Sequence, residues 1–498
     1  YKIFILLFTF LCYASYHLSR KPFSVVKNVL HRNCSKMHVD AGITVPVNDS
    51  TWCDWAPFDE GDYATMFGNL DVAFLSAYAV GMFFSGMLAE RINLRVYLGV
   101  GMILVGVATC MFGGGYFFNM HRYEFYVTAQ VFGGLFQSTG WPGVVAVMGN
   151  WFGKNHRGLI MGLWNSHTSV GNILGSVIPG VFAEHQWGWS FMVPGMIIGG
   201  LGFITFIVLV PRPSDVGCES PDHHGRTGSA RGSYEEIGPA DSSASDGISE
   251  SRPLLRSKEE PMTDEAISIW RAARLPGVLE FSLCLFFAKL VSYTFLFWLP
   301  KYIGATTNYG AEESADLSSL FDVGGIIGGV MAGVISDKTG CHGIVCVVML
   351  IVACPMLIVY HTYATVSYGI NILLLILCGM MVNGPYALIT TAVSADLGTQ
   401  KALRGNQKGL ATVTAIIDGT GSVGAALGPW LTGLISPTGW DNVFYMLIGA
   451  DICAALLLSR VFIREARRMC RSTLVVEERD ISVGKTVNID RVDVVNEN

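Results

Sequence analysis

Long apolar stretches, each of helix length, alternate with short polar loops along most of the chain. An α-helix needs about 20 apolar residues to cross the hydrocarbon of a bilayer. The pattern therefore predicts an all-α membrane protein with 12 transmembrane helices in two groups of six. The first group covers 2–30, 67–88, 95–118, 124–148, 158–182 and 188–210, and the second covers 276–300, 314–336, 342–362, 367–394, 409–434 and 440–463.

Basic residues concentrate in the loops on one side of these helices. The positive-inside rule makes that side cytoplasmic, together with both termini and the segment between the two groups. That segment is rich in Ser, Gly, Asp, Glu and Pro, a composition that buries too little apolar surface to fold. We therefore expect an N-terminal six-helix half at 1–210, a disordered cytoplasmic linker at 211–275, a C-terminal six-helix half at 276–465 and a cytoplasmic tail at 466–498.

The polar loop 31–66 falls on the opposite side of the membrane. It carries two glycosylation sequons, at Asn33 and Asn48. It also carries Cys34 and Cys53, and a disulfide between them is expected if the loop is lumenal, where the surroundings are oxidising.

The two groups of six repeat one another in sequence. A shift of 253 residues aligns 169–191 with 422–444 without gaps, and eight of 23 positions are identical. Such duplication is a mark of repeat architectures. Two pseudo-symmetric halves favour a carrier that rocks about a binding site at their interface, near the middle of the membrane.

A second repeated feature lies at the loop that follows the second helix of each half. The acid–base pairs Glu90-Arg91 and Asp337-Lys338 each follow a glycine by four residues. The glycine allows two helices to approach closely, and the charged pair can bridge a loop to a neighbouring helix in one conformational state. We therefore expect a gating or structural role for these four residues.

Two cations lie inside predicted spans, one in each half. Lys289 occupies the middle of an apolar run, where a charge costs about 2.5–3.5 kcal/mol on insertion scales. Arg20, followed by Lys21, lies inside the first span because apolar residues continue beyond Pro22. The alternative for Arg20 and Lys21 is that they end the span and extend to lipid headgroups. Cations that face a water-filled path from both halves indicate a carrier for an anionic solute.

Other polar and aromatic side chains share helix faces with these cations. Arg20 lies on one polar stripe of the first span, with Tyr16 alongside, and Tyr293 shares a face with Lys289. Five successive polar side chains surround His167, which is able to donate to phosphate or to titrate. The alternative role for Lys289 is a structural ion pair with a buried acid, for which Asp418 and Asp322 are the candidates. The candidate substrate-binding residues are Arg20, Lys289, His167, Tyr78, Lys21, Tyr16, Trp141, Tyr293 and Asp418.

Composition and motifs narrow the function classes. The chain is 51% hydrophobic and 14% charged, with a mean hydropathy of +0.44, and it has no basic domain that would bind nucleic acid. Walker, H-E-x-x-H and G-x-S-x-G motifs are absent from the sequence, so we expect neither enzyme chemistry nor a metal or cofactor. Arginine and lysine together suit a phosphate dianion.

Several strings resemble the sugar-phosphate exchangers of solute carrier family 37, most of all its exchanger 1 and 2 branch, within the organophosphate:phosphate antiporters of the major facilitator superfamily. They are YASYHLSRKPFSVVK, GNWFGKNHRGLIMGLWNSHTSVGNILGS, FSLCLFFAKLVSYTFLFWLP, NGPYALITTAVSADLGT and TAIIDGTGSVGAALGP. The resemblance implies the major facilitator fold and exchange of glucose 6-phosphate for inorganic phosphate in the endoplasmic reticulum membrane.

The same resemblance assigns roles to individual residues. Arg20 inherits a phosphate-ligand role, and Lys21, His167 and Tyr78 match positions in the family motif. The cation of the seventh helix matches less well, since relatives place it about one turn away, where this chain has Ser292. This departure puts the sugar specificity in question.

Two other functions fit the same residues. A proton-coupled organic-anion transporter would use His167 or Asp418 as a relay, and a non-transporting sensor or scaffold would keep a vestigial phosphate site. An intramembrane enzyme is a weaker option, because no nucleophile has an adjacent base. The sequence does not specify the sugar, the coupling stoichiometry or the oligomeric state.

Overall fold

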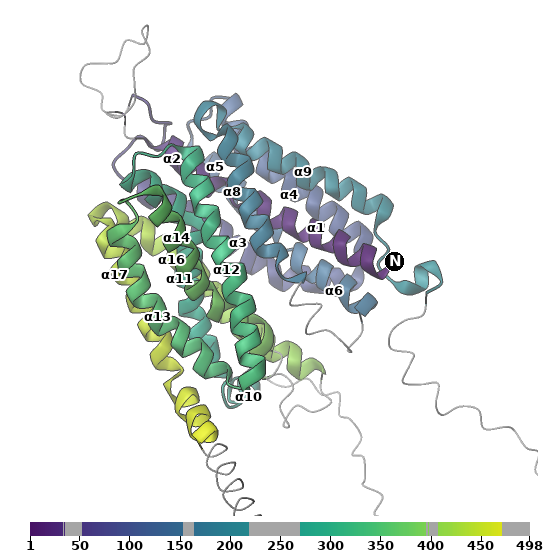
Figure 1. The fold of residues 1–498 in the computed structure, drawn as a ribbon. Coiled ribbons are helices and arrows are strands. Elements are labelled where there is room, and N and C mark those ends of the chain that lie inside the picture. Colours follow the sequence, from purple (N-terminus) through teal and green to yellow (C-terminus); the bar gives the residue numbers. More distant parts are fainter. Residues whose placement is uncertain are drawn as a thin grey trace, which may run out of the picture.

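The computed structural model describes residues 1–32, 34, 52–152, 164–218, 269–394, 397 and 407–470. All regular elements in these ranges are helices, arranged in two bundles (Figure 1). The N-terminal bundle contains α1 (Lys2–Arg20), α2 (Pro22–Leu30), α3 (Tyr63–Arg91), α4 (Leu94–Phe117), α5 (Tyr123–Gln137), α6 (Gly140–Phe152), α8 (His167–Gln186) and α9 (Trp189–Val208). The C-terminal bundle contains α11 (Val278–Thr306), α12 (Ala311–Thr339), α13 (His342–Tyr363), α14 (Tyr368–Leu388), η4 (Ile389–Val393), α16 (Gln407–Ile435) and α17 (Trp440–Leu457).

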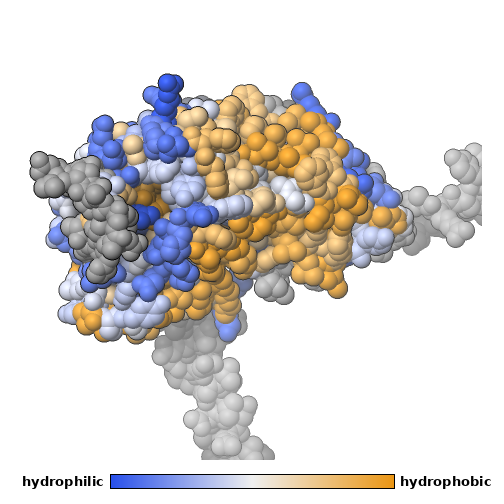
Figure 2. All heavy atoms as spheres, turned by 90° about the horizontal axis from the view of Figure 1, so that it is seen from above, coloured by the Kyte–Doolittle hydropathy of each residue, from blue (hydrophilic) through white to orange (hydrophobic). Residues whose placement is uncertain are grey.

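Each of the twelve predicted ranges overlaps a helix in the described part of the chain. Eight helical stretches there are long and apolar enough to cross a membrane by length and composition. Figure 2 shows a broad apolar band between polar ends. Large apolar side chains such as Phe84, Val107 and Phe203 are exposed on the molecule. The all-helical membrane fold is therefore confirmed, while the exact count of twelve stays a prediction.

Two predicted spans are each built from two helices. The span 2–30 divides into α1 and α2 at Lys21, and 124–148 divides into α5 and α6 at residues 138–139. Pro22 follows the first break and Pro142 the second. Proline lacks the N–H that would continue the helical hydrogen bonds, so each break has a local cause. The first break follows Arg20 directly, and Lys21 at the break keeps helical dihedral angles.

Glycines allow the closest helix contacts inside each half. A Cβ atom at Gly424 of α16 would meet the backbone carbonyl of Phe286 in α11, and one at Gly324 of α12 would meet that of Ile376 in α14. Backbones that touch this closely leave no room for a methyl group. The pair α11–α16 matters most for function, because it carries Lys289 and Asp418.

Gly424→Ala should therefore lower the free energy of unfolding by about 3 kcal/mol, since the added methyl overpacks a backbone contact. The matched control is Gly419→Ala on the same helix, where a Cβ meets no atom within 4 Å. Thermal unfolding of the purified protein in detergent measures both variants. Equal midpoints would contradict this account of the α11–α16 contact.

The two halves meet at one end and diverge toward the other (Figure 1). We call the meeting end, where α2 and α11 finish and α12 begins, the closed end, and the end that carries residue 1 and α10 (Ile269–Ala273) the open end. At the closed end, Asn28 donates to the carbonyl of Pro300 at 2.8 Å, and Gly68 packs against Gly433. The two bundles are thus in contact at the closed end and lie apart at the open end.

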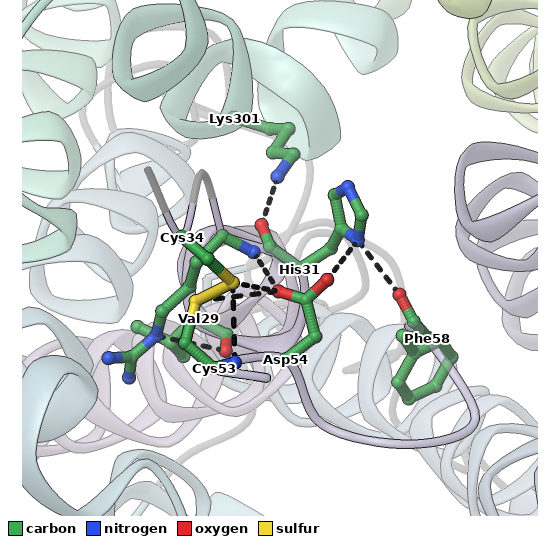
Figure 3. The surroundings of a disulfide bond; sticks show 8 residues. Val29, His31, Cys34, Cys53, Asp54, Phe58 and Lys301 are labelled. Atoms are coloured by element: carbon green, nitrogen blue, oxygen red, sulfur yellow. Dashed lines mark hydrogen bonds and ion pairs between the residues drawn. A yellow bond between two sulfur atoms is a disulfide. The ribbon is translucent and has the colours of Figure 1, made fainter. Parts of the chain in front are cut away.

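The loop that follows α2 is held at the closed end by a disulfide and by polar contacts. Cys34 and Cys53 form a disulfide, and the neighbouring Asp54 accepts from the Arg32 N–H at 2.6 Å and pairs with His31 at 2.9 Å (Figure 3). Lys301 of the other half donates to the His31 carbonyl at 2.6 Å. The expected disulfide is therefore present, and it braces a contact between the halves. The sequons at Asn33 and Asn48 lie outside the described residues.

The segment expected to be a linker, 211–275, has helical turns at both of its ends. They are η2 (Pro213–Val216) and α10, and residues 219–268 lie outside the described part of the chain. Helical residues also continue beyond α17, from 459 to 470, into the segment expected to be a tail. The disordered linker and the rest of the tail, from 471, stay predictions.

Candidate functional site

The two intramembrane cations face the same region between the halves. Arg20 ends α1, and its guanidinium carbon lies 5.7 Å from the centre of the Tyr293 ring, which belongs to α11. Lys289 lies four residues earlier on α11, and its ammonium is 5.7 Å from the centre of the Tyr386 ring. A cation of the N-terminal half thus contacts the helix that carries the cation of the C-terminal half.

Two tyrosines lie near both cations. The hydroxyls of Tyr78 and Tyr386 each lie within electrostatic range of both Arg20 and Lys289. Tyr78 belongs to α3 and Tyr386 to α14, and both also lie within electrostatic range of Asp418 on α16, so five helices from both halves contribute to one polar region. We call this region the cationic site and define it by Arg20, Tyr78, Lys289, Tyr293, Tyr386 and Asp418.

The ammonium of Lys289 is paired in this structure. Its Nζ lies 2.6 Å from Oδ1 of Asp418 on α16. The Lys289 side chain is only 6% exposed, whereas that of Asp418 is 48% exposed. A half-exposed carboxylate is hydrated at small cost, but a buried ammonium needs a partner. The carboxylate is therefore the partner that an incoming anion can displace.

An aromatic wall extends from Arg20 toward α8. The ring of Tyr13 is 4.7 Å from that of His167 and 5.4 Å from that of Trp141. His167 is fully buried, its Nδ1 lies 3.2 Å from the Thr168 hydroxyl, and its Nε2 has no hydrogen-bond partner among the described residues. Arg20 acts electrostatically on His167. The histidine thus lies beside the cationic site with one nitrogen unused.

Two candidates from the sequence lie elsewhere. The Tyr16 hydroxyl is 3.1 Å from Thr139 Oγ1, inside the N-terminal half. Lys21 is 1% exposed, and its Nζ lies 3.5 Å from Asp322 of α12, so it bridges the halves away from Lys289. The structure therefore places Tyr16 in the core of one bundle and Lys21 in an ion pair between bundles.

Sequence reasoning did not select two residues near the cationic site. Tyr386 lies in the string NGPYAL, where proline and apolar neighbours leave no polar stripe at helical spacing. Asn383, in the same string, accepts a hydrogen bond from Ser292 at 2.6 Å. The one sequence signal for these two residues was a polar side chain inside an apolar span. The same signal had led to the selection of His167 in the other half.

The expected gating residues lie toward the open end. Arg91, Asp337 and Lys338 are exposed, and nothing lies within 4 Å of a Cβ at Gly86 or Gly333. The Glu90 side chain lies outside what the structure describes. Because a Cβ at either glycine meets no neighbouring helix in this structure, a bridging role would belong to a different conformational state.

Comparisons with known proteins agree with this architecture. A model of the Major Facilitator Superfamily matches residues 60–412. The glucose-6-phosphate exchanger SLC37A2 of Bos taurus is 57% identical over 465 residues, which cover 93% of this chain and 94% of that protein. SLC37A2 of Homo sapiens is 55% identical, covering 93% and 92%, and the glucose-6-phosphate exchanger SLC37A1 of Mus musculus is 50% identical, covering 93% of each.

Solved structures show the same fold at much lower identity. A bacterial homolog to the human lysosomal transporter Spinster, in an inward-facing and unoccupied conformation, matches with a TM-score of 0.61 and 14% identity, covering 93% of this chain and 98% of that one. A D-xylose-proton symporter matches with a TM-score of 0.61 and 12% identity, covering 93% and 98%. The chain belongs to the Major Facilitator Superfamily and, within it, to the SLC37 family of the glucose-6-phosphate exchangers.

Proposed function

We propose that this protein exchanges glucose 6-phosphate, or a related sugar phosphate, for inorganic phosphate by alternating access. The observation that carries the proposal is the meeting of Arg20 and Lys289, from opposite halves, at one polar site. The names of the SLC37A1 and SLC37A2 relatives support the same activity.

The chemistry of the site suits a phosphate group. Arg20 offers a planar fork of donors that matches two phosphate oxygens, and Lys289 offers a compact charge. Tyr293 and Tyr386 place ring faces beside these cations, where a sugar ring can pack. The unpaired Nε2 of His167 is a further hydrogen-bonding group for the substrate.

Displacement of Asp418 explains how binding drives the cycle. An incoming phosphate takes the place of the carboxylate on Lys289, and Asp418 turns to water on its exposed side. Without the anion, closure would bury the Arg20 guanidinium while its Nε has no hydrogen-bond partner among the described residues, at a cost of several kcal/mol. Movement of the halves is therefore favoured only with substrate bound, which makes the exchange obligatory.

The direction of opening follows from the charge distribution. Basic loops and both termini are assigned to the cytoplasm, so the open end faces the cytoplasm and the closed end, with its disulfide, faces a lumen. An oxidising lumen and the SLC37 relationship favour the endoplasmic reticulum membrane as the location. Free phosphate and sugar phosphate are the small-molecule partners, and the bilayer is the surrounding phase.

Purified protein in vesicles tests obligatory exchange. Vesicles preloaded with phosphate should take up labelled phosphate more than about tenfold faster than unloaded vesicles, because return of the empty carrier buries unneutralised charge. External glucose 6-phosphate should compete with the label. Equal uptake into both kinds of vesicle would rule out strict exchange, and net uptake driven by a pH gradient without internal phosphate would favour proton coupling through His167.

A further inference from the structure

A charged pair is completely buried at the closed end, away from the cationic site. Lys27 of α2 and Asp71 of α3 lie 2.6 Å apart, and both side chains are 0% exposed. Lys27 lies within the predicted span 2–30, and the structure buries it inside the bundle. A buried pair gains little stability, since the loss of hydration offsets the attraction between the charges. Its position therefore calls for a role beyond folding.

Both members of the pair also bind the other half of the molecule. The Lys27 ammonium donates to the backbone carbonyl of Phe297 at 3.1 Å. The indole N–H of Trp298 donates to Oδ2 of Asp71 at 3.0 Å, the same oxygen that pairs with Lys27. The ammonium also lies 4.3 Å from the centre of the Trp298 ring, a distance suited to cation–π attraction. The C-terminal half thus closes over a charge pair of the N-terminal half.

The same short segment of α11 makes the neighbouring contacts between halves. Asn28 donates to the carbonyl of Pro300, and Lys301 donates to the carbonyl of His31, as Figure 3 shows. Residues 297–301 are therefore held by α2 and the disulfide-braced loop. Separation of the halves at the closed end has to break all of these bonds and admit water to Lys27 and Asp71.

This group meets the cationic site at one point, where the Phe297 ring lies 6.2 Å from the Tyr293 ring, and the ion pair and Trp298 lie farther along the helices. Lys27 follows Arg20 by seven residues, about 10 Å along a helix, and Phe297 follows Lys289 by eight, about 12 Å. A change at Trp298 therefore leaves the substrate-binding side chains in place. Its effect on transport has to come through the balance between the two states of the carrier.

We propose that Lys27, Asp71, Phe297 and Trp298 form a latch that holds the closed end shut and biases the empty carrier toward the open-end state. The inference rests on the proposed alternating access. Lys27 and Asp71 are positioning residues, since they touch no substrate. Because the pair belongs entirely to the N-terminal half, it persists when the latch opens, and the bonds to Phe297 and Trp298 set the bias.

Trp298→Phe is the sharpest test, since it keeps a six-membered aromatic ring and removes the indole N–H together with the five-membered ring that carries it. Its matched control is Trp187→Phe, because the buried Trp187 indole N–H has no hydrogen-bond partner among the described residues. Glu60 and Thr438 are exposed positions of the two halves near the closed end. Spin labels at these positions report the distance between the halves by double electron–electron resonance spectroscopy in lipid. The ratio of separated to closed molecules should rise about tenfold in Trp298→Phe and stay unchanged in Trp187→Phe.

Two further measurements complete the test. Asp71→Asn weakens the same bonds and should shift the ratio in the same direction. In vesicles of one orientation, Trp298→Phe should lower the half-saturating phosphate concentration on the closed face and raise it on the open face, a split that general destabilisation does not produce. An unchanged ratio in both variants, or an equal shift in the control, overturns the latch. If wild-type protein exchanges no phosphate but the labels shift as expected, the latch holds and the proposed function fails.

Discussion

Arg20→Gln should abolish phosphate exchange, and Arg20→Lys should retain a low residual exchange activity. The guanidinium is placed to donate to two phosphate oxygens, and hydrogen bonds to charged groups contribute about 1.5–3 kcal/mol each. Glutamine loses the charge and the fork, so exchange should fall by at least about hundredfold. Lysine keeps the charge without the fork, so a loss of about tenfold is expected.

Exchange of labelled phosphate in preloaded vesicles measures these losses. Lys2→Gln is the matched control, because it removes a cation from the exposed start of the same helix and should exchange like wild type. Size-exclusion profiles show whether each variant is folded. Full activity in folded Arg20→Gln would assign the arginine to structure and remove the main support for a phosphate site.

Much of the span pattern was predictable because membrane helices follow a length rule, which eight helical stretches of the described residues satisfy on their own. The breaks at Lys21 and at residues 138–139 were not placed, although Pro22 and Pro142 mark them in the sequence. A proline in a membrane helix is tolerated when neighbouring helices satisfy the freed backbone groups. Whether it breaks a helix therefore depends on the surrounding bundle, which one sequence does not specify.

Part of the site was predictable, because a charged side chain inside an apolar span is unfavourable unless it has a partner or a functional role. Arg20 and Lys289 stood out because a cation inside an apolar span is costly. The roles of Lys21 and Lys27 were missed because their partners, Asp322 and Asp71, lie far away in sequence. Helical spacing groups side chains on one helix but does not say which face meets the other half.

The pairing of Lys289 with Asp418 raises a question that single variants do not settle. Lys289→Met should abolish exchange, but it also leaves Asp418 without its partner. Because the Asp418 carboxylate is half exposed, water can hydrate it, and the variant should still fold. Asp418→Asn removes the group that competes with phosphate for the ammonium, so exchange should persist with a lower half-saturating phosphate concentration.

The double variant Lys289→Met/Asp418→Asn separates the two roles of the lysine. A double-mutant cycle isolates the coupling between contacting residues when each single change only removes the interaction. If Lys289 binds phosphate, the double variant should fold like wild type and exchange no faster than Lys289→Met, at least about hundredfold below wild type, since phosphate would lack its charge-assisted bond to the ammonium. If Lys289 serves only to neutralise Asp418, removal of both charges should restore exchange. Phosphate-loaded vesicles distinguish the two outcomes, because a structural lysine becomes dispensable once its acid is gone and a substrate ligand does not.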